Sequence, residues 1–153
     1  MSVPADLYLG VDGGGTGCRC RLETAAGEVL GSGIAGPASL RLGLEASLAA
    51  VMQAARGAIA EAGLSEADFA RVHAGICLAG IGRKGMQEAL AAWQTPFAET
   101  VFESDGLAAC LGAHAGEDGG IVIIGTGSIG LARVNGEEVR IGGYGFPIGD
   151  EGS

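Results

Sequence analysis

Residues 7–16 place three consecutive glycines and a threonine directly after a short apolar strand that ends in an aspartate. Glycine has no Cβ, so its backbone N–H groups are unobstructed and the chain can turn through positive φ. Such a turn can wrap an anion with main-chain donors, and Asp12 puts a carboxylate at its mouth, where a hydrated Mg²⁺ would sit. A hairpin needs only two turn residues, so Gly13, Gly14 and Gly15 exceed that requirement. The stretch predicts either a tight hairpin turn or a phosphate site at the end of a core strand.

The charge and hydropathy of the chain exclude several classes of partner. The chain has 153 residues and a formal net charge of −9, and Lys84 is its single lysine. A nucleic-acid surface would need clustered Lys and Arg, so neither nucleic acid nor an anionic membrane is expected as a partner. No apolar stretch approaches the roughly 20 residues that span a bilayer, and no signal peptide opens the sequence. We therefore expect a cytoplasmic protein that holds any phosphorylated ligand with backbone amides and a metal.

The cysteines give no sign of a zinc or dithiol site. Cys18 and Cys20 share one face of a strand, while Cys77 and Cys110 lie elsewhere in the sequence. They form no C-x-x-C pair and have no histidine at zinc-finger spacing. Free cysteine is among the most buried residue types. We expect all of them to be reduced and mostly buried.

Hydrophobic periodicity predicts an α/β organisation. Residues 6–12, 17–24 and 28–34 are expected to form an antiparallel meander with the glycine turn at its first bend. Apolar residues at spacings of three and four predict a helix over 44–62, and Gly63 would end it in the C′ position. Further strands are expected at 72–79, from 101, and at 121–124, 129–134 and 137–141, and further helices at 84–93, at 106–114 and after a capping box at 65–68.

A second strand and glycine turn repeat the opening motif. The apolar run 121–124 leads into Gly125-Thr126-Gly127-Ser128, and Asn135-Gly136 then signals a type I′ hairpin. The glycines of the second turn also satisfy the dinucleotide-binding pattern, but that fold requires a helix directly after them, so NAD binding is rejected. No P-loop motif is present. The repeat predicts two phosphate-binding turns in one chain.

Asp105 stands where a predicted strand meets the N-terminus of a predicted helix. The helix dipole favours an ionised carboxylate there. Asp105 is therefore either a helix cap or a general base that accepts a proton from an attacking hydroxyl. His73 in a strand and His114 at a helix end are lone histidines, and we expect no catalytic role for either.

Four motifs follow one another in a characteristic order: Asp12-Gly-Gly-Gly-Thr16, Ser104-Asp105, Gly125-Thr-Gly-Ser128 and Gly149-Asp-Glu-Gly-Ser153. In this combination the chain resembles the BadF/BadG/BcrA/BcrD ATPase family of the actin-like superfamily, and within it the bacterial glucosamine and N-acetylglucosamine kinases. The resemblance implies an α/β fold of the actin-like (ribonuclease H-like) type, with a mixed sheet and helices. ATP and sugar would lie between two domains, of which residues 1–117 are the first and residues 118–153 the start of the second.

The resemblance also implies a role for each motif. Asp105 would deprotonate the sugar 6-hydroxyl, and Asp12 would help to place Mg²⁺. The β- and γ-phosphates of ATP would be held by Gly13, Gly14, Gly15 and Thr16 from one side and by Gly125, Thr126, Gly127 and Ser128 from the other. The sugar would be bound by Ser39, Gly80, Asp105 and Asp150. Many relatives have Asn where this chain has Ser39, so both glucosamine and N-acetylglucosamine stay open as substrates.

Three alternatives stay beside this interpretation. ATPase activators of radical dehydratases or reductases belong to the same family, but they hold an Fe–S cluster with cysteines in a glycine-flanked loop. A non-enzymatic sugar sensor would need a DNA-binding segment before the first strand. A plain carbohydrate-binding module would explain the Asp150 loop but not two phosphate-type turns.

The length of the chain is its largest departure from the family. Relatives are about twice as long, and the apolar strand 121–124 has no obvious cover within these residues. We expect a fragment that turns over little by itself. A homodimer is common among actin-like kinases and is left open.

Overall fold

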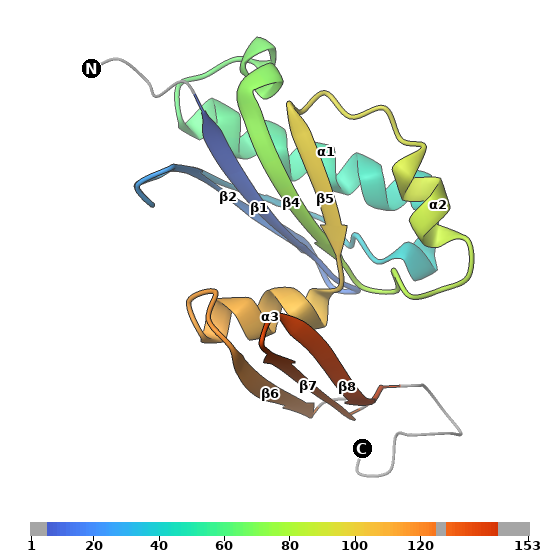
Figure 1. Cartoon of the computed structure of the whole chain (residues 1–153). Helices are drawn as coiled ribbons and strands as arrows, with labels where there is room; N and C mark the ends of the chain where they lie inside the picture. The colour runs from blue at the N-terminus through green and yellow to red at the C-terminus, as the bar shows by residue number, and fades with distance from the viewer. Residues whose placement is uncertain (1–5, 125–127, 144–153) are drawn as a thin grey trace. The chain divides into compact units, whose positions relative to one another are not determined.

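The computed structural model describes residues 6–124 and 128–143. The chain divides into two compact units, Met1–Asp105 and Gly106–Ser153 (Figure 1). The predicted domain boundary after residue 117 concerns the longer family fold and stays a prediction. In the described part of the chain, no helix combines the length and apolar character needed to cross a membrane.

A five-stranded mixed sheet forms the centre of the first unit, as predicted for the α/β class. Its strands are β1 (Leu7–Gly13), β2 (Cys18–Thr24), β3 (Val29–Ala35), β4 (Val72–Leu78) and β5 (Glu99–Glu103). They lie in the order β3-β2-β1-β4-β5. The first three pair antiparallel, which confirms the predicted meander, and β1, β4 and β5 run parallel.

One face of this sheet is covered by the long helix α1 (Leu44–Glu61), seen behind the strands in Figure 1. Strand residues alternate between the buried face and an exposed face, so Leu7, Leu9 and Val11 pack in the core. On β3 the inward positions are Gly31 and Gly33, where a Cβ would overlap backbone carbonyl oxygens of α1. The absence of side chains at these two positions lets helix and strand backbones touch.

The predicted end of α1 is confirmed in detail. Gly63 adopts φ +71°, its N–H donates to Ala60 O, and the N–H of Leu64 donates to Ile59 O. These two bonds form a Schellman motif, which supplies donors to backbone carbonyl groups that have no hydrogen-bond partner within the last turn of the helix. A short 3₁₀ helix, Glu66–Arg71, follows the expected capping box.

The helix α2 (Met86–Ala91) is shorter than the predicted span 84–93. Gly85 lies just before it with φ +83°, in the left-handed region, so no helical turn can extend back to Lys84. The sequence prediction of this boundary is wrong because it ignored that glycine.

The second unit holds a three-stranded antiparallel sheet. Its strands are β6 (Gly119–Ile124), β7 (Ser128–Val134) and β8 (Glu137–Gly142), and α3 (Asp105–Ala113) precedes them. Asn135 and Gly136 have φ values of 53° and 78°. Positive φ at both positions is the requirement of a type I′ turn, so the predicted hairpin is confirmed.

Candidate active site

The carboxyl ends of parallel strands bring acidic side chains to one edge of the first sheet. Asp12 of β1 pairs in register with Cys77 of β4, and Cys77 pairs with Glu103 of β5. The three residues therefore share the face turned away from α1, where Asp12 and Glu103 are exposed. Asp105 follows shortly after Glu103 and opens α3. In open α/β sheets, ligands bind at this end of the strands.

The surroundings of Cys77 at this edge raise the pKa of its thiol. Its burial, and then the carboxylates of Glu103, Asp12 and Asp105, raise the pKa of Cys77 to about 11. All three carboxylates thus lie near enough to disfavour a thiolate. Glu103 is missing from the sequence prediction, because only the pairing of β4 with β5 brings it beside Cys77. An edge of this charge suits a metal-bound anion better than a free one.

Asp12 offers a donor that fits Mg²⁺. Its carboxylate is 54% exposed, and Arg19 Nη2 on the neighbouring strand lies 3.4 Å from Asp12 Oδ2. Exposed pairs of this kind add little stability, so the carboxylate can exchange partners. Within the described residues, no three His, Cys, Asp or Glu side chains converge as a metal cage. Mg²⁺ usually takes one or two carboxylates together with water and substrate phosphates, and Asp12 fits a site of that kind.

In the glycine turn after β1, the surroundings exclude a side chain at Gly13 but not at Gly15. At Gly13 a Cβ would lie 2.6 Å from Leu78 Cδ2 and 3.0 Å from Ala38 Cβ, so packing excludes a side chain there. At Gly15 a Cβ would meet nothing within 4 Å, and the residue does not have a positive φ. Neither packing nor backbone conformation therefore requires glycine at position 15. Its exposed backbone leaves room for a ligand to approach closely.

Hydrogen bonds tie this turn to the loops beside it. The N–H of Gly14 donates to Gly17 O at 2.9 Å, and Gly14 O accepts from the N–H of Ala38 at 2.9 Å. The N–H of Ala79, after β4, donates to Gly13 O at 2.9 Å. The turn is thus held on both sides by backbone bonds, and Thr16 stays exposed.

Ser39 and Gly80, the predicted sugar residues of this unit, lie in adjoining loops. Ser39 Oγ donates to Ala79 O and accepts from the N–H of Arg41, each at 3.4 Å. Ser47 Oγ on α1 donates to Ser39 O at 2.7 Å. Gly80 has φ +89°, and a Cβ there would lie 3.5 Å from Arg41 Cγ. The structure thus brings these two positions together, with Ser39 only 4% exposed and its hydroxyl hydrogen-bonded to both loops.

Of the remaining predicted positions, Asp105 lies next to the acidic edge, Ser128 lies in the second unit, and the others lie outside the described residues. Asp105 is exposed and is the first residue of α3. Ser128 is the first residue of β7. Gly125, Thr126, Gly127 and Asp150 lie outside the described residues.

The lone histidines make contacts that belong to the fold. His73 stacks on Tyr8 with ring centroids 5.4 Å apart, and its Nδ1 lies 3.2 Å from Glu99 Oε2. His114 Nε2 lies 3.1 Å from Gly120 O. His73 occupies the start of β4, several residues before Cys77 and the acidic edge.

All four cysteines are free thiols, as predicted, and Cys18, Cys20 and Cys110 are buried while Cys77 is half-buried. Burial, with a further contribution from Asp12, raises the pKa of Cys18 to about 11. The pKa of Cys20 is also raised to about 11, mainly by burial and secondly by the neighbouring Cys18. These thiols are therefore protonated and unreactive near neutral pH.

The strand order of the first unit, with a glycine turn after β1 and an acidic residue after β5, defines an α/β domain of the actin-like ATPase class. The family model of the BadF/BadG/BcrA/BcrD ATPase family matches residues 9–153, and the chain belongs to this family.

Individual relatives agree with this assignment. The chain is 43% identical over 148 residues to the glucosamine kinase GspK of Vibrio cholerae, a match that covers 97% of this chain and 50% of that protein. It superposes with a TM-score of 0.87 and 36% identity on a candidate N-acetylglucosamine kinase from Chromobacterium violaceum, covering 96% of this chain and 52% of that one. A candidate N-acetylglucosamine kinase from Porphyromonas gingivalis, 20% identical with a TM-score of 0.66 over 94% of this chain and 50% of that one, shares the fold. The chain thus spans about half the length of these relatives.

Proposed function

We propose that this chain supplies one half of an ATP-dependent kinase that phosphorylates the 6-hydroxyl of an amino sugar, glucosamine or N-acetylglucosamine. The observation that supports this most directly is the acidic edge beside the glycine turn, where strand pairing sets Asp12 and Glu103 on either side of Cys77 and Asp105 follows two residues later. The 43% identity to a glucosamine kinase supports the choice of substrate class. Phosphoryl transfer depends mainly on positioning and charge stabilisation, and this edge offers groups suited to both.

The proposed chemistry assigns one task to each group. The N–H groups of Gly13, Gly14 and Gly15 and the hydroxyl of Thr16 would hold the β- and γ-phosphates of ATP. The carboxylate of Asp12 would hold Mg²⁺, which neutralises the phosphate charge when bound. From the second unit, Gly125, Thr126, Gly127 and Ser128 would hold the phosphates from their other side.

Asp105 would act as the general base. Its carboxylate would accept the proton of the sugar 6-hydroxyl while the bond from O6 to the γ-phosphorus forms and the bond from that phosphorus to the β-phosphate oxygen breaks, releasing ADP. Ser39, Gly80 and Asp150 would contact the sugar. Because the Ser39 hydroxyl already donates to Ala79 O in the loop after β4 and accepts from the N–H of Arg41, its contribution would include holding these two loops together.

The proposal also includes Mg²⁺ as the metal and a cytoplasmic location. It leaves the oligomeric state open, with a homodimer as one alternative. Free thiols are consistent with a reducing compartment. The cysteines lie in strands and in α3, so no observation favours the Fe–S activator as a second function.

The test is a coupled assay of ADP release by the full-length enzyme, with Mg-ATP and glucosamine, N-acetylglucosamine, glucose or no sugar. We expect release to depend on an amino sugar and Asp105→Asn to lower kcat by about 10²–10⁴-fold, the usual contribution of a general base. Glu99→Gln is the matched control, because it neutralises a carboxylate on the opposite end of β5 beside His73. Release without sugar, or an unchanged rate in Asp105→Asn, would refute the proposal.

A further inference from the structure

A groove of about 570 Å³ runs along α1 on the side of Trp93, and we call it the α1 groove. Its apolar lining comes from Trp93, which follows α2, and from three residues of the helix, Leu44, Leu48 and Met52. Leu48 is 8% exposed, and the ring of Trp93 packs against Phe102 with centroids 6.0 Å apart. The groove therefore lies wholly within the first unit and has an apolar lining that is anchored to the core.

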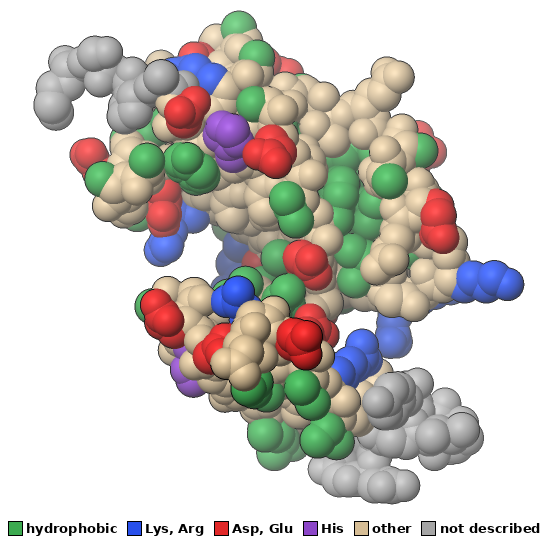
Figure 2. Space-filling model, in the orientation of Figure 1, with side chains coloured by type: hydrophobic (Ala, Val, Ile, Leu, Met, Phe, Trp, Pro, Cys, Tyr) green, Lys and Arg blue, Asp and Glu red, His purple; other side chains and the backbone are tan. Residues whose placement is uncertain are grey.

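The two charged residues of the α1 groove have opposite signs and stand toward its opposite ends. Glu45 lies in the first turn of α1, and Arg56 follows about three helical turns later, or about 16 Å along the axis. On the face of the sheet turned away from α1, by contrast, charged side chains of both signs are dispersed (Figure 2). Among the described residues Glu45 has no ion-pair partner, whereas Arg56 Nε lies 2.9 Å from Glu66 Oε1. That pair is exposed, and exposed pairs add little stability, so Arg56 can accept a second carboxylate.

Two uncharged residues complete a line along the helix between these ends. Positions 45, 49, 52 and 56 are separated by four, three and four residues, a spacing that keeps side chains on one side of an α-helix. Ala49 is exposed and small, and Met52 is half-buried and long. When a second α1 is laid antiparallel with a two-fold axis between residues 50 and 51, Glu45 of each copy faces Arg56 of the other. Ala49 likewise faces Met52, so the line is complementary to itself in both charge and size.

We propose that the α1 groove is the interface of a homodimer, in which α1 of a second copy packs antiparallel along it. A two-fold dimer uses the same patch on both copies, which must therefore complement itself. Two Glu45–Arg56 ion pairs form near the ends, and each Met52 fills the space over Ala49 of the partner subunit. A parallel arrangement would set Glu45 against Glu45 and Arg56 against Arg56, so the charges select the antiparallel one. Dimerisation of this kind requires nothing of the proposed reaction.

The test is sedimentation velocity of the full-length enzyme over a range of micromolar concentrations, which measures the Kd of a dimer. We expect a dimer for the wild type. Glu45→Arg and Arg56→Glu should each raise the Kd by about tenfold or more, because each sets like charges against one another at both ends of the interface. The variant that carries both substitutions restores opposite charges and should dimerise as the wild type does. Arg21→Glu is the matched control, because Arg21 is an exposed arginine on β2 that also pairs with a glutamate of its own chain.

Circular dichroism of each variant checks that it stays folded, which the exposure of Glu45 and Arg56 leads us to expect. A wild type that stays monomeric would overturn the inference. A dimer with the same Kd in Glu45→Arg, Arg56→Glu and Arg21→Glu would also overturn it, since that dimer would use another surface. Weakening in both single variants without recovery in the double variant would refute the antiparallel pairing. None of these outcomes depends on kinase activity, so a failed ADP assay leaves this test intact.

Discussion

Gly13 and Gly15 should respond in opposite ways to the same substitution. In Gly13→Ala the new methyl group would lie 2.6 Å from Leu78 Cδ2, against about 3.5–4.0 Å for carbon atoms in favourable contact. Leu78 and Ala38 are fully buried, so neither can move into solvent. Overpacking of this kind costs about 1–3 kcal/mol. For a unit of this size the melting temperature should fall by about 4–8 °C for each kcal/mol.

Gly15→Ala should leave the fold intact or stabilise it slightly. Its methyl group would meet nothing within 4 Å, and loss of freedom in the unfolded chain contributes about 0.4–1 kcal/mol of stability. In the full-length enzyme, the same methyl group would stand where the phosphates approach. We expect the affinity for ATP to fall at least tenfold, equivalent to about 1.4 kcal/mol.

The assays are thermal unfolding of residues 1–153, followed by circular dichroism, and ATP binding to the full-length enzyme by calorimetry. A drop in melting temperature for Gly15→Ala as large as that for Gly13→Ala would show that the glycine at position 15 serves the fold. Unchanged ATP affinity in a stable Gly15→Ala variant would refute the assignment of this turn to phosphate binding.

Three further outcomes are expected. Gly33→Ala should lower the free energy of unfolding by about 3 kcal/mol, because a Cβ there overlaps the carbonyl oxygen of Ala54. Urea unfolding measures this change, and Gly10→Ala, whose Cβ would meet nothing within 4 Å, is the control. The backbone N–H of Ser65, and next the side chain of Arg71, lower the pKa of Asp68 below its usual 3.8. The ionised Asp68 carboxylate should therefore stabilise the fold above pH 3.8, and this stabilisation should be lost as the pH falls below that value. The melting temperature of Asp68→Asn should therefore depend less on pH below 3.8 than that of the wild type. With its pKa raised to about 11 by burial and then by the neighbouring carboxylates, Cys77 should react with iodoacetamide at pH 8 about two orders of magnitude more slowly than a free thiol. Comparable rates would contradict this combined effect of burial and acidic neighbours.

Local signals account for what the sequence predicted correctly. The meander, the long helix, its end at Gly63 and the hairpin at Asn135-Gly136 each depend on residues close together in the chain. The actin-like class required several such motifs in order. The position of Asp12 at a strand end also followed from local pattern.

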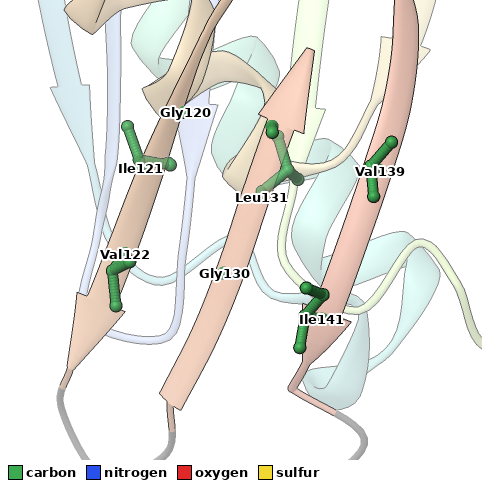
Figure 3. Close-up of a pocket in the computed structure, with 8 residues that line it drawn as sticks. Gly120, Ile121, Val122, Gly130, Leu131, Val139 and Ile141 are labelled. Atoms are coloured by element: carbon green, nitrogen blue, oxygen red, sulfur yellow. The ribbon is translucent and has the colours of Figure 1, made fainter. Parts of the chain in front are cut away.

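Features that depend on strand pairing could not be predicted in this way. Glu103 becomes part of the candidate site only because β5 pairs with β4 in the register that sets it beside Cys77. Likewise, the sequence predicted an apolar strand at 121–124, but only strand pairing brings Gly130 and Ile141 together in a shallow groove of the β6-β7-β8 sheet (Figure 3). The start of α2 was missed because the left-handed conformation of Gly85 is not apparent from helical periodicity.

The direct contact between α1 and β3 has a consequence for how the first unit can move. Shear motion lets packed elements slide a little as the side chains between them change rotamer. At Gly31 and Gly33 no side chains intervene, and the backbone of α1 rests on the strand itself. Sliding would move the backbone of α1 off these two glycines and toward strand positions that carry side chains. We therefore expect α1 and β3 to move together as one rigid body, with any hinge motion of this unit confined to its loops.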